Sequence, residues 1–142
     1  MSKPVTGMSA VPEWEGRRVA LVGLALGHGT THTAEEHLER LHTRLTARGA
    51  HVVYHVIQRR RAPEAATYIG RGKAEQLGAL CAFSGIEAVV VDSALSASQI
   101  RNLTLLVGRA IYDRGSASSR RGAPVRRRRT ADRRPLRRPV RP

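Results

Sequence analysis

Short runs of apolar residues predict four β-strands. They are Val19–Leu24, Val52–Ile57, Ala88–Asp92 and Ala110–Tyr112. The first and third runs are almost wholly apolar, which is typical of strands buried on both faces of a parallel sheet. The second run is rich in β-branched and aromatic side chains, which favour the pleated surface of a sheet.

Amphipathic segments between these runs predict three helices. In the first, Thr33 and Glu36 have the spacing of a capping box, so we expect Thr33 to be the N-cap and Gly49 to end the helix. In the third, Ser96 and Gln99 have the same spacing. The apolar side chains at helical spacing, which we expect to face the core, are Leu38, Leu41, Leu45, Leu77, Leu80, Cys81, Ile100, Leu103 and Val107. Gly85 and Gly108 are placed to end the second and third helices.

The order of these elements is β-α-β-α-β-α-β. Strands that alternate with amphipathic helices predict an α/β fold, here a small four-stranded parallel sheet flanked by helices. We expect a flexible leader over residues 1–16, a single α/β domain over 17–114, and a disordered, basic, Arg/Pro-rich tail over 115–142.

Positive charge is concentrated in the tail. The chain carries a net charge of +14, of which residues 1–114 contribute +4 and residues 115–142 contribute +10. We therefore expect the tail arginines to bind nucleic acid non-specifically through phosphate groups.

Other classes of protein are disfavoured by composition. The single cysteine, Cys81, excludes an internal disulfide and is expected to be a buried, unreactive thiol in a reducing compartment. No run approaches the roughly 18 apolar residues of a membrane helix. Residues 1–15 lack the apolar centre of a signal peptide, so we expect a cytoplasmic protein with no membrane partner.

A glycine-rich stretch precedes the second predicted helix. After a polar connection over residues 58–67, Gly70 and Gly72 allow a positive φ or a close approach to a partner, and Lys73 follows at the helix mouth, where an anion is favoured. Gly70, Gly72 and Lys73 are thus a candidate phosphate loop. The spacing differs from the P-loop pattern G-x-x-x-x-G-K-[ST], and the alternative is a tight loop with a solvated lysine.

Basic residues gather near the same place. Binding in a parallel sheet occurs at the carboxyl ends of the strands. We expect that edge to carry a basic rim facing a polyanion, made of Arg59, Arg60, Arg61, Arg71 and Lys73. The alternative is a solvated charge run at a strand end.

The sequence gives little indication of a metal site or a catalytic site. His28, His32, His37 and His42 lie close together in the sequence, but His37 and His42 would point about 140° apart on a helix at 100° per residue. We predict surface histidines, no metal site and no catalytic residues. The stretch from Gly23 to Gly29 follows a strand as a dinucleotide loop would, but does not spell G-x-G-x-x-G.

Two motifs carry a resemblance to a known family. The segment Tyr68–Lys73, with Glu75 and Leu77 behind it, and the segment Leu95–Leu103 resemble signature blocks of the N-terminal domain of HflX-type GTPases. Gln58-Arg59-Arg60 and Asp113-Arg114 follow the family's order as well. The resemblance covers residues 17 to 114 and none of the tail.

The resemblance implies an α/β domain that associates with the large ribosomal subunit, and hence that the basic rim faces ribosomal RNA. The full-length family binds GTP and Mg²⁺ in a later domain whose motifs we do not find here, so we expect a truncated HflX-like protein that does not hydrolyse GTP and needs no cofactor. Residues 115–142 are either a functional RNA-binding arm or a frameshift product. The competing interpretation is a free-standing nucleotide- or small-ligand-binding α/β domain with an RNA-binding tail.

Overall fold

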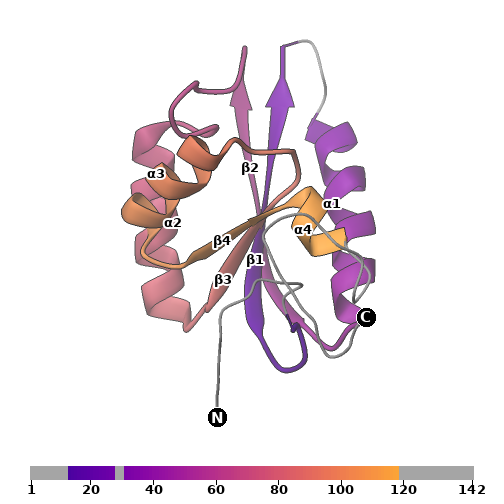
Figure 1. Cartoon of the computed structure of the whole chain (residues 1–142). Helices are drawn as coiled ribbons and strands as arrows, with labels where there is room; N and C mark the ends of the chain where they lie inside the picture. Colours follow the sequence, from indigo (N-terminus) through magenta and orange to yellow (C-terminus); the bar gives the residue numbers. More distant parts are fainter. Residues whose placement is uncertain (1–12, 28–30, 119–142) are drawn as a thin grey trace, which may run out of the picture. The chain divides into compact units, whose positions relative to one another are not determined.

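The computed structural model describes residues 13–27 and 31–118 of the 142-residue chain. Residues Trp14–Gly115 form one compact unit. Its strands are β1 (Arg18–Leu26), β2 (His51–Arg60), β3 (Ala88–Val91) and β4 (Ala110–Asp113). The helices are α1 (Thr31–Thr46), α2 (Arg71–Ser84), α3 (Ala97–Val107) and a short α4 (Arg114–Ser118) (Figure 1).

The four strands form one sheet in the order β2-β1-β3-β4, and every neighbouring pair is parallel. This confirms the predicted α/β fold with a four-stranded parallel sheet. The register of β1 against β2 shifts between Val19 and Ala20, so β2 contains one extra residue there. Such a bulge bends a strand locally without ending the ladder.

Helices cover both faces of the sheet. In Figure 1, α1 lies on one side, and α2 and α3 lie on the other. Successive side chains of a strand point to opposite faces, so β1 serves both layers. A Cβ added at Gly23 would lie 3.5 Å from the Leu38 side chain of α1, whereas Ala20 and Val22 join the core beneath α2 and α3.

The larger core lies between the sheet and the α2/α3 layer. Its buried members come from three strands, two helices and the connections before and after α2. They are Ala20, Val22, Tyr68, Ile69, Ala74, Leu77, Cys81, Ile86, Val89, Val91, Leu103, Val107 and Ile111. Leu80 and Ile100, predicted to face inward, are partly buried against it. α2 and α3 approach closely because Gly78 has no side chain: a Cβ there would lie 3.0 Å from the Val107 carbonyl oxygen.

The helix ends agree with the sequence in most places. The Ser96 hydroxyl accepts a hydrogen bond from the Gln99 N–H, and the Gln99 side chain accepts one from the Ser96 N–H, which confirms the capping box. Gly85 and Gly108 end α2 and α3 with φ values of 66° and 75°. The predicted N-cap at Thr33 is wrong, because α1 already begins at Thr31 and Thr33 lies in its first turn.

Strand β2 is longer than predicted. Residues Gln58 to Arg60, which the sequence places in a polar connection, continue the ladder by pairing with Leu24 to Leu26 of β1. Polar residues are tolerated there because β2 is an edge strand whose side chains are only partly buried. The connection to α2 is correspondingly short and begins at Arg61.

The expected leader and tail lie mostly outside the described residues. Trp14, which belongs to the leader by composition, is 3% exposed and packs edge-on against Tyr112 with 5.2 Å between ring centroids. Helix α4 occupies the first residues of the expected tail. Among the described residues, none of the helices is both long and apolar enough to span a membrane.

Candidate functional site

The connection between β2 and α2, residues 61–70, is held in one conformation by short-range bonds. Glu64 and Tyr68 exchange two backbone hydrogen bonds of 2.8 Å and form an isolated antiparallel bridge. The Thr67 hydroxyl donates to the Ile69 carbonyl oxygen at 2.7 Å. Tyr68 has a φ of 66°, a left-handed conformation that side chains with a Cβ rarely adopt. Its ring is buried in the core, so packing holds the backbone in this conformation.

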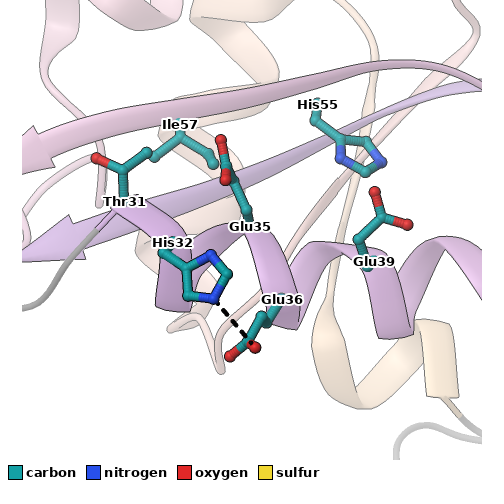
Figure 2. A pocket seen from close by; sticks show the side chains of 7 residues that line it. All are labelled: Thr31, His32, Glu35, Glu36, Glu39, His55 and Ile57. Atoms are coloured by element: carbon teal, nitrogen blue, oxygen red, sulfur yellow. Dashed lines mark ion pairs between the residues drawn. The ribbon is translucent and has the colours of Figure 1, made fainter.

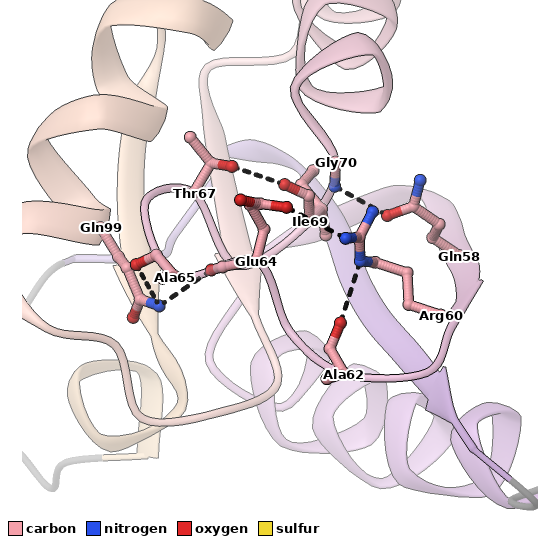
Figure 3. Close-up of polar contacts among 9 residues, drawn as sticks. All are labelled: Gln58, Arg60, Ala62, Glu64, Ala65, Thr67, Ile69, Gly70 and Gln99. Atoms are coloured by element: carbon pink, nitrogen blue, oxygen red, sulfur yellow. Dashed lines mark hydrogen bonds and ion pairs between the residues drawn. The ribbon is translucent and has the colours of Figure 1, made fainter.

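Side chains of β2 bind this connection from one side (Figure 3). The Gln58 side-chain oxygen accepts a hydrogen bond of 2.9 Å from the Gly70 N–H. The Arg60 guanidinium donates to the Ala62 carbonyl oxygen at 3.0 Å and pairs with the Glu64 carboxylate at 3.1 Å. Gln58 and Arg60 therefore fix the chain where it leaves the strand and where it enters α2.

Side chains of α3 bind the connection from the other side. The Gln99 side-chain N–H₂ group donates to the carbonyl oxygens of Glu64 and Ala65 at 3.4 and 3.3 Å (Figure 3). The Asn102 side chain donates to the Ala66 carbonyl oxygen at 2.9 Å. The Leu95–Leu103 motif thus binds residues 64–66, which lie directly before the Tyr68–Lys73 motif in the sequence. We refer to residues 61–70 with these four bracing side chains as the braced loop.

The two glycines of the candidate phosphate loop lie at the start of α2 and have no positive φ. Gly70 has φ −61° and ψ 147°, and Gly72 lies in the first turn of α2 with open space around it. Of the two properties expected, close approach is found at Gly70, where a Cβ would lie 2.9 Å from the Arg60 guanidinium. A positive φ is found instead at Tyr68, which sequence reasoning missed because an aromatic residue gives no signal for it.

The residues of the expected basic rim are placed unequally. Arg60 points into the braced loop and pairs with Glu64. Arg71 is exposed and lies 3.7 Å from the Glu75 carboxylate one turn along α2. Arg59 and Arg61 are exposed, and Lys73 is half-buried in the first turn of α2. Since side chains alternate along a strand, Arg59 projects from the face opposite to Arg60, together with His55 and Ile57.

A second polar site lies in the crevice between α1 and β2, which we call the α1–β2 crevice (Figure 2). It is an open pocket of about 470 Å³, lined by Thr31, His32, Glu35, Glu36, Glu39, His55 and Ile57. At its end, Nδ1 of His42 lies 2.9 Å from Nε2 of His55, with the rings edge to face. Burial and, to a smaller extent, His42 lower the pKa of His55 below 6.5, while the carboxylates of Glu39 and Glu35 oppose this.

The other histidines have separate partners. His32 lies 3.3 Å from the Glu36 carboxylate, and His37 lies 3.9 Å from Asp92. His28 is outside the described residues. As arranged, no three His, Cys, Asp or Glu side chains within residues 13–27 and 31–118 are close enough together to hold a metal. Sequence reasoning compared the α1 histidines only with one another and missed His55, which comes from the neighbouring strand.

Cys81 and the stretch that begins at Gly23 are the two remaining candidates from the sequence. Cys81 is fully buried, as expected, and burial raises the pKa of its thiol. Gly23, the first glycine of the stretch compared with a dinucleotide loop, lies inside β1 beneath Leu38. The strand runs on to Leu26, so Gly23 is not available to a nucleotide phosphate. Gly29 lies outside the described residues.

The fold and the braced loop define the chain as a small parallel α/β domain with a conformationally fixed segment, flanked by basic residues, at the carboxyl edge of its sheet. Residues 35–116, more than half of the chain, match the family described as GTP-binding GTPase N-terminal. The chain belongs to this family and is an HflX-type N-terminal domain.

Two curated relatives agree with this assignment. The chain is similar to a GTPase HflX of Flavobacterium psychrophilum, with 27% identity over 97 residues, which make up 68% of this chain and 24% of the relative. It is also similar to a GTPase HflX of Alkalihalophilus pseudofirmus, with 39% identity over 69 residues, which make up 49% of this chain and 16% of the relative. The matched regions therefore span about a quarter or less of the relatives.

Proposed function

We propose that this chain is an RNA-facing N-terminal domain of the HflX type, which contacts ribosomal RNA of the large subunit and contributes binding rather than GTP hydrolysis. The observation that carries the proposal is the braced loop, which fixes a backbone segment flanked by exposed basic residues at the carboxyl edge of the sheet. The matched relatives are named GTPases, and hydrolysis by their whole chains is a separate property from the binding proposed here.

The charges near the braced loop suit a polyanion. Arg61 is exposed at its start, and Arg71 and Lys73 lie in the first turn of α2 at its end. The pair between Arg71 and Glu75 is exposed and 3.7 Å long, so it holds the guanidinium weakly and a phosphate can replace the carboxylate. Arg60 is excluded from this surface because it is used internally. The proposed RNA-facing set is therefore Arg61, Arg71 and Lys73. Arg59 is not included, because it projects from the other face of β2.

The test compares two variants of equal charge. In the first, Arg61, Arg71 and Lys73 are changed to Gln, and in the second Arg40, Arg44 and Arg101 are changed to Gln. Both variants carry three fewer positive charges and keep the 11 tail arginines, so non-specific attraction falls equally. Binding to large-subunit ribosomal RNA is measured from 50 to 300 mM salt.

We expect the first variant to bind about tenfold or more weakly. Its log–log salt slope should fall by about 2 to 3, because each phosphate group that is no longer neutralised lowers the slope by about one unit. The second variant should retain most of the affinity and slope. Equal reductions in both variants would show that net charge alone determines binding, and would refute the proposed surface.

A further inference from the structure

We propose that the α1–β2 crevice is a binding site for a divalent transition metal such as Zn²⁺, with His42 and His55 as its nitrogen ligands and Glu39 as a carboxylate ligand. The proposal is independent of RNA binding and concerns the opposite face of β2. The imidazole rings of His42 on α1 and His55 on β2 face each other across the crevice.

The facing nitrogens are close to the spacing that a metal requires. Nδ1 of His42 and Nε2 of His55 are 2.9 Å apart. Two imidazole nitrogens on one tetrahedral Zn²⁺, each at about 2.0–2.1 Å, are about 3.3 Å apart. The rings would therefore separate by a few tenths of an ångström, and each would tilt so that its nitrogen lone pair points at the metal, which replaces the shared hydrogen. Each imidazole can remain neutral by carrying its hydrogen on the other ring nitrogen.

The spacing along α1 supplies carboxylates on the same side. At 100° per residue, Glu35, Glu39 and His42 fall within about 60° of one another around the helix. Glu35 and Glu39 also line the pocket with His55, as Figure 2 shows. Both glutamate side chains are exposed, so neither is fixed by packing in its present position. In the present arrangement neither completes a three-ligand set, and a rotation of the exposed Glu39 side chain would supply the third ligand.

The charge of the crevice favours a cation despite the basic chain. Three of the chain's 11 acidic residues, Glu35, Glu36 and Glu39, line one pocket. Imidazole nitrogen with carboxylate oxygen is a donor set that suits Zn²⁺, Ni²⁺ and Cu²⁺ better than Mg²⁺ or Ca²⁺, which prefer oxygen. The crevice is open on one side, so a water molecule can take the fourth position.

The test is titration of the full chain with ZnCl₂ by calorimetry at pH 7.5, together with the visible absorption of the Co²⁺ form. We expect one site in the micromolar range, which His42→Gln and His55→Gln each weaken at least tenfold. Glu39→Gln should weaken it less, because a water can replace a single carboxylate. His51→Gln, a change on the same strand outside the crevice, is the matched control and should leave binding unchanged.

Two results would overturn the proposal. One is Zn²⁺ binding of equal strength in the wild type and in the His42→Gln/His55→Gln double variant, which would place the ligands elsewhere. The other is an NMR titration of the wild type in which the imidazole signals of His42 and His55 do not move at saturating Zn²⁺. The second measurement needs no substitution, so it is decisive even where a variant folds poorly. A wild type that binds no Zn²⁺ up to millimolar concentration belongs to this second case, because its imidazole signals would not move.

Discussion

The two sides of β2 use polar residues in opposite ways. On the α2/α3 side, Gln58 and Arg60 bond the backbone of the braced loop, and Gln99 and Asn102 do so from α3. On the α1 side, the polar groups of the crevice face one another: His42 meets His55 with glutamates nearby. Side chains that bond the backbone fix the conformation of the loop. Side chains that contact only other side chains can exchange those contacts for a ligand.

This difference changes how the family motifs are interpreted. Four of the residues that carry the resemblance to HflX domains are internal braces. Gln58, Arg60, Gln99 and Asn102 all bond main-chain atoms of residues 62–70. The side chains proposed to face RNA, Arg61, Arg71 and Lys73, lie beside these braces in the sequence or at the start of α2. The motifs therefore identify a loop conformation first, and the proposed binding surface only through it.

The largest expected effect tests the core beneath the braced loop. Leu103 is 1% exposed and packs in the α2/α3 core, so Leu103→Ala should lower the free energy of unfolding by about 2–5 kcal/mol through reduced burial and a cavity. Leu105→Ala on the same helix, where the side chain is 78% exposed, should change it by less than about 0.5 kcal/mol. Urea unfolding followed by circular dichroism measures both, and similar values for the two would contradict the packing described.

An intermediate effect tests the braces themselves. Gln99→Ala removes the bonds to Glu64 and Ala65 together with half of the capping box, and should cost about 1–2 kcal/mol. Asn102→Ala should cost about 1 kcal/mol by freeing the Ala66 carbonyl group.

The local signature of this destabilisation is amide hydrogen exchange. The Tyr68 N–H, which bonds the Glu64 carbonyl oxygen, should exchange faster in both variants. The exposed Gln76 of α2 provides a control, since Gln76→Ala should leave that exchange unchanged. If exchange at Tyr68 is insensitive to both α3 substitutions, the loop is held by its own bonds and the bracing role is wrong.

The smallest effect tests the crevice. The pKa of His55 is lowered in the folded chain, by burial first and by His42 second, against the opposing carboxylates of Glu39 and Glu35. As pH falls through the ordinary value of 6.5, the unfolded chain takes up a proton at His55 before the folded chain does. The free energy of unfolding should therefore fall as the pH is lowered from 7 to the folded pKa of His55. Below that pKa, His55 should cause no further decrease.

His55→Gln should make the stability curve flatter over that interval, measured by thermal unfolding between pH 7.5 and 5. His51→Gln on the same strand is the control and should keep the wild-type slope. A steeper curve for His55→Gln would mean that the carboxylates outweigh burial, which would reverse the direction of the pKa shift.

Much of the fold was predictable because local signals agree with one another. The four apolar runs and the glycines after α2 and α3 all point to the same parallel α/β arrangement, and the Ser96–Gln99 capping box is present with both bonds. The start of α1 was misplaced because Thr33 has the right spacing but an earlier residue, Thr31, begins the helix. The end of β2 was misplaced because polar residues on an edge strand resemble a loop in sequence.

The site was less predictable because its geometry depends on contacts between distant segments. The rim residues were found by charge, but the internal use of Arg60 depends on Glu64 and on the backbone of Ala62. The pairing of His42 with His55 depends on which strand lies beside α1, and the spacing of histidines within one helix does not contain that information. The positive φ of Tyr68 results from burial and bridging together.

The strand order also bears on self-association. Within the described residues β2, the longest strand, bonds β1 alone and leaves its outer row of backbone groups without a strand partner. Such an edge is a template for a second copy of the same strand. In this protein the strand ends in adjacent arginines, Arg59 and Arg60, and two molecules aligned side by side would bring like charges together. The cationic end of β2 thus disfavours parallel, in-register pairing of this strand with a second copy.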